Sequence, residues 1–463
     1  MSILSTDATT FYALRDDRTD RCTGGRREYQ ETSCLVYLAP SLAETRVGQT
    51  MLLVSANLLS RWCRRVTIVA PPTDLRCKLG SSASEIGEGA IAQMRDADPF
   101  GTFVLGRHAE NSDYRLVLCI GDDAPGLSGT GRVFINSAGW LAGISRVRPV
   151  SLPFENDENC FGAIAAACLG VTQVFKLALG MAQEQMLRDG LFDLFRLAWT
   201  ESREPGPWPS ALDVGRVLMV GAGSVASSAA YAMRLAGLNG HLTILDKDVV
   251  KIQNFNRSPL FGMETLGLAK ADAISIALRR SGLEAHAVPI WWNDFVERQA
   301  RETFDFDVWL PLANEFGVRG SMQHNVPPLM IHASTSANWG VNHGRHLPAT
   351  DDCLVDRFPR EVAANDMRCA EGEAVVEDVR VDAALPFASL FAGLLVAVDL
   401  LRANCAEFPQ VPNFTLLDFY GSLEEIQKWD RRPRVDCICR EQHRLHERYN
   451  ARTRHWGRFR FAK

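Results

Sequence analysis

The chain has 463 residues, of which 46% are hydrophobic and 23% are charged, as in soluble globular proteins with two or three domains. The net charge of −5 gives no bulk attraction toward nucleic acid or an anionic membrane, so we expect neither as a partner. No apolar run approaches the roughly 18 residues that cross a membrane, and the first residues lack the apolar centre of a signal peptide. We therefore expect a cytoplasmic protein.

The first half contains the elements of an α/β fold without a phosphate-binding loop. Residues 50–72, TMLLVSANLLSRWCRRVTIVAPP, predict an apolar helix followed by a strand, and residues 159–180 predict a long helix rich in small apolar side chains. No glycine-rich loop precedes the helix at 50–72. We expect residues 1–200 to form a degenerate α/β domain.

The second half begins after a linker predicted at 201–213, where proline and glycine are frequent. GRVLMVGAG at 215–223 predicts a strand that enters a glycine turn, and the following SVASSAAYAMRLAG predicts a helix. HLTILDKD at 241–248 predicts the next strand. This strand–helix–strand unit opens a second α/β domain, expected at 214–430.

The two halves share the order of their predicted elements, which favours an internal duplication. Residues 382–402 predict a second long helix of small apolar residues, matching the one at 159–180. The alternative is that any two doubly wound α/β domains show this order. The second half has additional residues between the matching landmarks, so we expect an insertion at about 330–382. A basic tail is expected at 431–463, either as a solvated helix or as a docking surface.

A nucleotide-binding loop is predicted where the second half begins. Gly221, Gly223 and Ala226 fit the pattern G-x-G-x-x-A, in which the glycines permit a tight turn and a close approach of backbone amides to phosphate. Ser224 begins a helix whose N-terminus attracts anions. Asp246 ends the next strand, where a carboxylate can accept hydrogen bonds from ribose. These residues suit NAD and ATP equally.

The residues that follow distinguish the two nucleotides. Asn254, Arg257 and Lys270 supply an amide and two cations just beyond the ribose carboxylate. Such a set suits a triphosphate that is being cleaved, and a nicotinamide has no use for it. The alternative is that Arg257 and Lys270 are ordinary surface cations. The set as a whole favours ATP.

This stretch resembles the adenylating domain of the ThiF/MoeB and ubiquitin-activating enzyme superfamily. The family pattern is a glycine loop, then D-x-D-x-V-x-x-x-N-x-x-R, then G-x-x-K, and the chain has each part, from Asp246 to Arg257 and at Lys270. The resemblance implies two Rossmann-like ThiF-type adenylation domains in one chain, the first degenerate and the second active. It also implies that Asp246 holds ribose and that Asp248, Asn254, Arg257 and Lys270 lie around ATP, with Arg257 and Lys270 polarising its phosphates.

In paired members of this superfamily, the inactive domain can lend an arginine to the phosphates. The segment FYALRDDRTDR offers Arg15, Arg18 and Arg21, and the sequence does not choose among them. The family also has an aspartate–asparagine pair that binds magnesium, where this chain has Asn314 and Glu315. Either Glu315 provides the oxygen ligand after a shift of one residue, or Asn314 binds the ion weakly.

Two sets of cysteines follow from the same resemblance. The family often holds a structural zinc with two C-x-x-C pairs, and the corresponding residues here are Cys353, Asp356, Cys437 and Cys439. Three thiolates and a carboxylate can make a tetrahedral zinc site, and the alternative is that they are remnants of a lost one.

The family's nucleophile is a cysteine shortly before the second long helix, which corresponds to Cys369. A thiolate on a polar loop can attack an activated carboxyl group. The alternative is that Cys369 is an inert loop thiol. Cys353 is the second candidate for this role, because Arg357 lies nearby and can lower the pKa of a thiol.

The resemblance implies ATP-dependent adenylation of the C-terminus of a ubiquitin-like protein, with release of pyrophosphate, followed by a thioester on Cys369 and transfer to a conjugating enzyme. A degenerate and an active domain in one chain is similar to the activating enzymes of bacterial ubiquitin-like conjugation operons, which are associated with antiviral defence. A homodimer stays open. The alternatives are an NAD-dependent Rossmann oxidoreductase and a non-catalytic nucleotide-binding scaffold, for which Asn314 is the best support.

Overall fold

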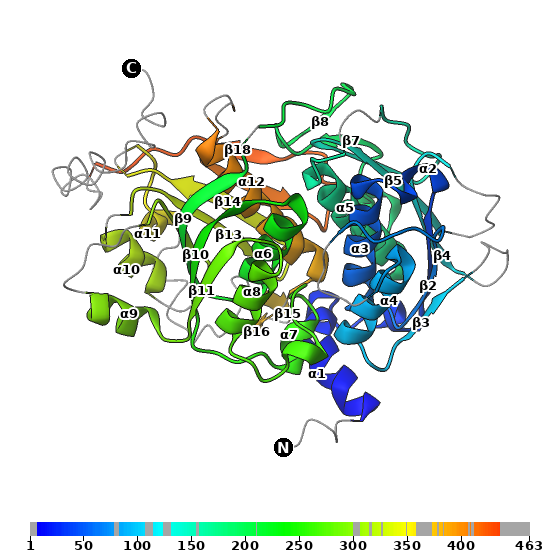
Figure 1. Ribbon diagram of the computed structural model, residues 1–463, viewed down its shortest axis with the longest axis horizontal. Helices are drawn as coiled ribbons and strands as arrows, with labels where there is room; N and C mark the ends of the chain where they lie inside the picture. The colour runs from blue at the N-terminus through cyan, green and yellow to red at the C-terminus, as the bar shows by residue number, and fades with distance from the viewer. Residues whose placement is uncertain are drawn as a thin grey trace.

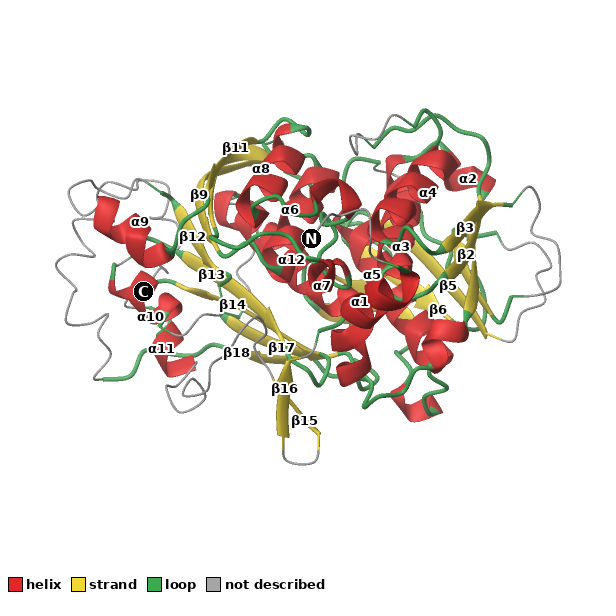
Figure 2. Cartoon of the chain, turned by 90° about the horizontal axis from the view of Figure 1, so that it is seen from below, coloured by secondary structure: helices red, strands yellow, loops and turns green. Residues whose placement is uncertain are grey.

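In the computed structural model, two eight-stranded sheets enclose a central layer of helices (Figure 1, Figure 2). The structure describes residues 7–77, 83–106, 114–123, 131–153, 157–209, 211–299, 306–313, 317–325, 327–348, 350–357, 373–376, 379–382, 384–405, 408 and 412–435. Figure 2 shows the helix layer between the sheets, with the outer face of each sheet turned away from it. This arrangement places the apolar helices of both halves in one interior.

The first sheet has the strand order β3-β2-β1-β4-β5-β6-β7-β8. Its strands are β1 (Ser33–Leu38), β2 (Arg65–Val69), β3 (Thr102–Leu105), β4 (Leu116–Ile120), β5 (Gly131–Ala138), β6 (Leu141–Ser145), β7 (Gly190–Asp193) and β8 (Ala198–Thr200). The helices of this half are α1 (Ala8–Cys22), α2 (Pro40–Ala43), α3 (Arg46–Ser60), α4 (Ile86–Ala97) and α5 (Phe161–Ala178), with short 3-10 turns η2 (Glu28–Glu31) and η3 (Gln183–Gln185).

The second sheet has the order β11-β10-β9-β12-β13-β14-β17-β18. Its strands are β9 (Asp213–Val220), β10 (Asn239–Leu245), β11 (Glu284–Val288), β12 (Val308–Pro311), β13 (Met330–Thr335), β14 (Gly340–His346), β17 (Phe414–Asp418) and β18 (Gln427–Trp429). The helices are α6 (Ser224–Ala236), α7 (Ile252–Phe255), α8 (Lys270–Arg279), α9 (Trp292–Gln299), α10 (Val318–His324), α11 (Leu354–Arg357) and α12 (Pro386–Asn404), with η4 (Met263–Thr265). A separate hairpin joins β15 (Glu373–Val376) to β16 (Val379–Asp382).

The two sheets have the same topology, which supports the predicted duplication. In each sheet the first five strands of the order pair in parallel and the last three pairings are antiparallel. The halves differ after their first strand, because β1 leads through Ala39 into a helix that begins at Pro40, whereas β9 leads into the glycine turn. The predicted pair of Rossmann-like domains, the first without its phosphate loop, is therefore present.

The insertion predicted at about 330–382 begins later than expected. Residues 330–346 form β13 and β14, which are core strands with counterparts β5 and β6 in the first sheet. The segment between β14 and α12 runs from 347 to 385, whereas the one between β6 and α5 runs from 146 to 160. The predicted start of the insertion rested on the positions of the apolar helices alone, and these positions do not report which strands pair between them.

The expectation that no apolar run is long enough to cross a membrane is wrong for helices α5 and α12. Both are long and apolar enough by length and composition. In the structure α5 is 94% buried and α12 is 100% buried over the relevant window, so both are accounted for as core helices.

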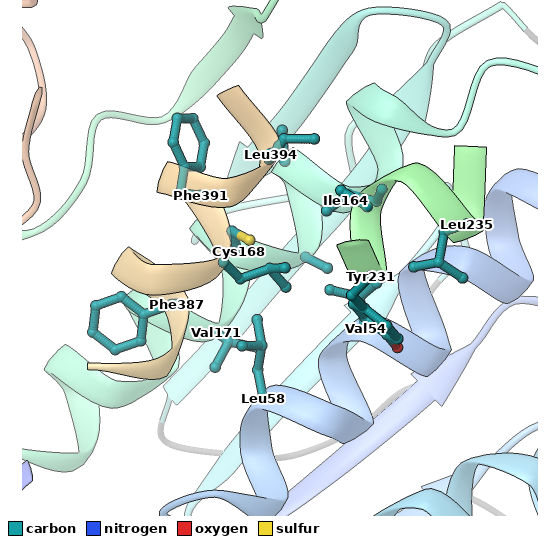
Figure 3. Packing of buried hydrophobic residues seen from close by; sticks show 14 of the residues in the cluster. Val54, Leu58, Ile164, Cys168, Val171, Tyr231, Leu235, Phe387, Phe391 and Leu394 are labelled. Atoms are coloured by element: carbon teal, nitrogen blue, oxygen red, sulfur yellow. The ribbon is translucent and has the colours of Figure 1, made fainter. Parts of the chain in front are cut away.

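The halves share one hydrophobic core. Figure 3 shows side chains of α3, α5, α6 and α12 packed together, among them Val54, Cys168, Tyr231 and Phe391. Within the second half, α12 approaches α6 closely at Gly393, where a Cβ atom would lie 2.3 Å from the backbone nitrogen of Ala229. The absence of a side chain at this position lets the two helices pack in direct backbone contact.

A buried ion-pair group joins β14 to α12. Asp399 Oδ2 lies 3.1 Å from His343 Nε2, and Asp399 Oδ1 lies 2.6 Å from Arg402 Nη1. Burial alone would raise the pKa of Asp399, but His343, Arg402 and Arg345 together hold that pKa well below its usual value. The ionised carboxylate is therefore the form that the fold stabilises.

We expect this group to make stability sensitive to acid. The folded-state pKa of Asp399 is lowered. Its ionised carboxylate therefore contributes to the free energy of unfolding above the unfolded-state pKa of about 3.9, and this contribution is lost as the pH falls from there through the folded-state pKa. Asp399→Asn should be less stable at pH 7 by roughly 1–3 kcal/mol, and the difference from wild type should narrow between pH 5 and pH 2. Urea unfolding of both proteins at each pH measures this difference in the free energy of unfolding. A constant difference would show that the charge of Asp399 contributes nothing.

Candidate nucleotide site

One pocket lies at the carboxyl ends of β9, β10, β12 and β13, and we call it the strand-end pocket. It has about 700 Å³ of empty space. Ligands of open α/β sheets bind at this edge. The pocket brings together eight residues that the sequence predicted around the nucleotide: Gly221, Gly223, Ser224, Asp246, Asp248, Asn254, Arg257 and Lys270.

The structure explains the absence of a side chain differently at the two glycines of the loop. Gly221 has φ of 93°, and a Cβ atom there would lie 2.4 Å from the backbone nitrogen of Ala313. Gly223 has an ordinary φ of −79° and open space where a Cβ would stand. Gly223 caps the N-terminus of α6, so the open space lies where backbone amides and the helix dipole favour an anion.

This difference predicts opposite outcomes for two alanine substitutions. Gly221→Ala should destabilise the protein by roughly 1–3 kcal/mol, because it introduces both strain and a backbone clash. Gly223→Ala should leave the melting temperature of the nucleotide-free protein nearly unchanged but weaken ATP binding, because its methyl group occupies the space for phosphate. Thermal unfolding with and without ATP measures both. Equal behaviour of the two variants would contradict this assignment.

Asp246 organises the loop. Its Oδ2 accepts a hydrogen bond from the backbone nitrogen of Ala222 at 2.6 Å, and its Oδ1 accepts one from Asp248 at 2.8 Å. Burial raises the pKa of Asp246, while Lys270 and the two amides act in the opposite direction. The carboxylate thus fixes the glycine turn to the end of β10 and lines the pocket where ribose is expected.

Lys270 is the first residue of α8 and is nearly buried, at 6% exposure. Its Nζ lies 2.9 Å from Asp248 Oδ2. Burial opposes ionisation of Asp248, but Lys270 and then Lys247 lower the pKa of this carboxyl overall. Lys270 is therefore held against this carboxylate at the wall of the pocket.

Asn254 and Arg257 come from the turn around α7. Asn254 Oδ1 accepts a hydrogen bond from the backbone nitrogen of Lys251 at 2.9 Å. Arg257 Nη1 donates to the carbonyl of Gln253 and to Asn256 Oδ1, both at 2.8 Å. These contacts orient Arg257, which is 4% exposed, toward the pocket that it lines.

The sequence reasoning missed several residues of the pocket. Arg319, from α10, adds a third cation to the pocket lining. Ser334 and Thr335 end β13 and contribute hydroxyl groups. The signal that could have found them is their place at the carboxyl end of a predicted parallel strand or just after one. Ala384, two residues before the start of α12, also lines the pocket, and its carbonyl accepts a hydrogen bond from Asn256.

The three arginines of α1 have different surroundings. Arg15 is fully buried in ion pairs with Asp16 and Asp98, and Arg21 pairs with Asp17. Arg18 is different, because its charge and that of Arg257 both act on Cys22, where burial raises the pKa of the thiol and the two cations lower it. None of these three arginines is among the residues that line the strand-end pocket, so the structure does not choose the donor.

Several predicted residues lie outside the described part of the chain. They are Asn314, Glu315, Cys369, Cys437 and Cys439, together with the side chain of Asp356. Cys353 is described, and it is 2% exposed and disulfide-bonded. The nearby Arg357 forms an ion pair with Asp352. The roles of Cys353 as a zinc ligand and as the second candidate nucleophile stay predictions.

Within the residues that the structure describes, no group of three or more histidine, cysteine, aspartate or glutamate side chains could hold a metal ion. His332 Nε2 accepts a hydrogen bond from Arg357 Nη1 at 2.8 Å, and His346 Nδ1 lies 2.8 Å from the carbonyl of Asp352. These histidines belong to the buried polar packing behind β13 and β14. Arg431, the first residue of the basic tail predicted at 431–463, pairs with Asp352 at 2.9 Å, and residues 436–463 lie outside the described part of the chain.

The fold and the strand-end pocket define an α/β protein with a candidate nucleotide site at the carboxyl ends of its parallel strands. Residues 208–434 match the ThiF family, and residues 33–190 match the BilD N-terminal domain. The second half thus matches the ThiF family, and this part of the chain is similar to the ThiF/MoeB superfamily of E1-like proteins.

Two relatives are similar in sequence. The uncharacterized protein y4jF of Sinorhizobium fredii is 31% identical over 271 residues, which are 58% of this chain and 49% of that protein. The adenylyltransferase and sulfurtransferase UBA4 of Eremothecium gossypii is 45% identical over 65 residues, which are 14% of this chain and 14% of that protein. The chain therefore spans about half of the first relative and a small part of the second.

Solved structures of Escherichia coli MccB are similar over 48% of this chain and 66% of that chain. The complex with succinimide has 14% identity and a TM-score of 0.38. The complex with AMPCPP and MccA has 16% identity and a TM-score of 0.37.

Proposed function

We propose that this protein binds ATP with magnesium in the strand-end pocket and adenylates the C-terminal carboxylate of a small ubiquitin-like protein. The observation that carries the proposal is the convergence on one pocket of a glycine loop, a carboxylate at the end of β10 and three cations. The ThiF family match supports ATP and magnesium as cofactors. The UBA4 similarity supports adenylyl transfer.

The chain's own residues account for the first step. Asp246 would accept hydrogen bonds from ribose, and the amides at the N-terminus of α6 would face the phosphates. An oxygen of the substrate carboxylate attacks the α-phosphorus, the bond from that phosphorus to the bridging oxygen of the β-phosphate breaks, and pyrophosphate leaves. Arg257, Lys270 and Arg319 would stabilise the charge that develops on the leaving group.

Magnesium and the arginine of the first half complete the proposed site. Bound magnesium would neutralise phosphate charge, and Asn314 and Glu315 stay the ligand candidates, outside the described residues. Arg15, Arg18 and Arg21 of α1 stay the candidate donors from the degenerate half.

A second step is proposed for Cys369. Its thiolate would attack the carbonyl carbon of the acyl adenylate, AMP would leave, and the thioester would pass to a conjugating enzyme. We also propose that the protein acts in the cytoplasm. We propose further that it is encoded in a bacterial operon for ubiquitin-like conjugation with a role in antiviral defence. The pairing of a degenerate half with an intact one in a single chain supports this placement.

ATP–pyrophosphate exchange tests the proposed function. The substrate is a candidate ubiquitin-like protein encoded beside this gene, with a second sample that lacks its last two residues. Exchange should depend on the intact C-terminus, disappear in Arg257→Ala and persist in Cys369→Ala. ATP binding without exchange would indicate a scaffold, and preferential binding of NAD would indicate an oxidoreductase.

A further inference from the structure

The turn that carries Asn254 and Arg257 continues into a loop with buried backbone carbonyls. Residues 256–262 have no helix or strand, and Pro259 and Phe261 in this loop are buried, as is Phe255 just before it. A buried carbonyl without a partner is costly, so these oxygens need donors. The donors come from the other half of the chain.

Arg61, at the end of α3, provides most of them. Its Nη1 donates to the carbonyls of Phe255 and Phe261, the latter at 3.1 Å, and its Nη2 donates to the carbonyl of Pro259 at 3.0 Å. Its Nε donates to Asn57 Oδ1 at 2.8 Å, and Asn57 Nδ2 donates to the same Pro259 carbonyl at 3.0 Å. One guanidinium therefore holds three carbonyls of the loop.

Arg61 is 2% exposed, and no salt bridge to it is present among the described residues. Burial lowers its pKa to about 10, so the side chain stays charged near neutral pH. A buried arginine without a paired carboxylate is costly unless its hydrogen bonds are all well placed. This residue is therefore specialised for the carbonyls that it binds.

Two other elements of the first half hold the same segment. Asp96, near the end of α4, accepts a hydrogen bond from the backbone nitrogen of Glu264 at 2.8 Å. On α1, Phe11 packs against Phe255 with ring centroids 6.2 Å apart, and Thr19 accepts from Asn256 at 3.4 Å. Helices α1, α3 and α4 thus contact the loop from three sides.

We propose that Arg61 is a positioning residue for phosphate binding: the first half, which has no phosphate loop, holds the Asn254–Arg257 turn of the second half in the geometry that binds the triphosphate. This inference rests on the proposed function. Asn254 and Arg257 lie on either side of Phe255, whose carbonyl Arg61 holds, so a shift of this backbone moves both side chains that face the phosphates.

The test compares Arg61→Met with Lys176→Met in the full chain. Lys176 is a matched control because it is also fully buried and also crosses between the halves, donating to the carbonyl of Gly421 at 2.6 Å, but it does not line the strand-end pocket. Dissociation constants for ATP and AMP are measured by calorimetry below the melting temperature of every variant. Arg61→Lys is included as the conservative variant.

In Arg61→Met, we expect ATP affinity to fall about tenfold and AMP affinity to change by less than about twofold, because the misplaced groups face the β- and γ-phosphates. Arg61→Lys should recover part of the ATP affinity. Lys176→Met should lose stability but keep both affinities within about twofold. Equal losses for ATP and AMP, or the same ATP loss in Lys176→Met, would overturn the inference.

Hydrogen exchange on the nucleotide-free protein separates this inference from the proposed function. Amides of residues 254–262 should exchange faster in Arg61→Met than in Lys176→Met. Unchanged exchange there would overturn the positioning role even if ATP binds. Faster exchange in a protein that binds no ATP would show that Arg61 holds the loop. It would also refute the proposed function, and with it the role of Arg61 in phosphate binding.

Discussion

Replacing Lys270 with methionine should lower ATP–pyrophosphate exchange by about 10²-fold or more while leaving the fold intact. Lys270 Nζ is held at the pocket wall, 2.9 Å from Asp248 Oδ2, with 6% exposure. A fixed cation in a site from which water is largely excluded stabilises charge that develops on phosphate far more than a cation in water does. Methionine keeps most of the side-chain volume, so the change removes mainly the charge.

Arg280→Met is the matched control, because Arg280 is an exposed cation just after the other end of α8. Its exchange rate should stay within about twofold of wild type, since exposed charges contribute little. Circular dichroism and the melting temperature establish that both variants fold. Wild-type exchange in Lys270→Met would remove the lysine from the proposed mechanism.

The sequence predicted the second half well because its signals are local. The glycine turn, the helix after it and the carboxylate at the end of β10 are set by short-range spacing, and the structure places Gly223 and Asp246 in one pocket. Arg319 and Ser334 escaped because they reach the pocket through the order of parallel strands, which a single sequence does not state.

The role of the first half could not be predicted from the sequence. Arg61 follows an apolar helix and stands three residues before the basic pair Arg64–Arg65, a pattern that indicates an exposed helix end. In the structure it is buried, because the partner that covers it is a loop about two hundred positions away. Contacts of this length depend on the packing of α3 against the second half, and neither periodicity nor composition reports that packing.

Phe175→Ala should destabilise the whole chain by roughly 3–5 kcal/mol, because the ring is fully buried and its neighbours come from both halves. Its centroid lies 4.9 Å from Trp62 of the first half and 5.5 Å from Trp339 of the second. Since one core joins the sheets, hydrogen exchange of α3 and α12 should show the same loss of free energy. Val147→Ala, at a residue 75% exposed, should change stability by less than about 0.5 kcal/mol. A loss confined to α3 would show that the halves unfold separately, and the first half could then not act as a fixed support for the phosphate-binding turn.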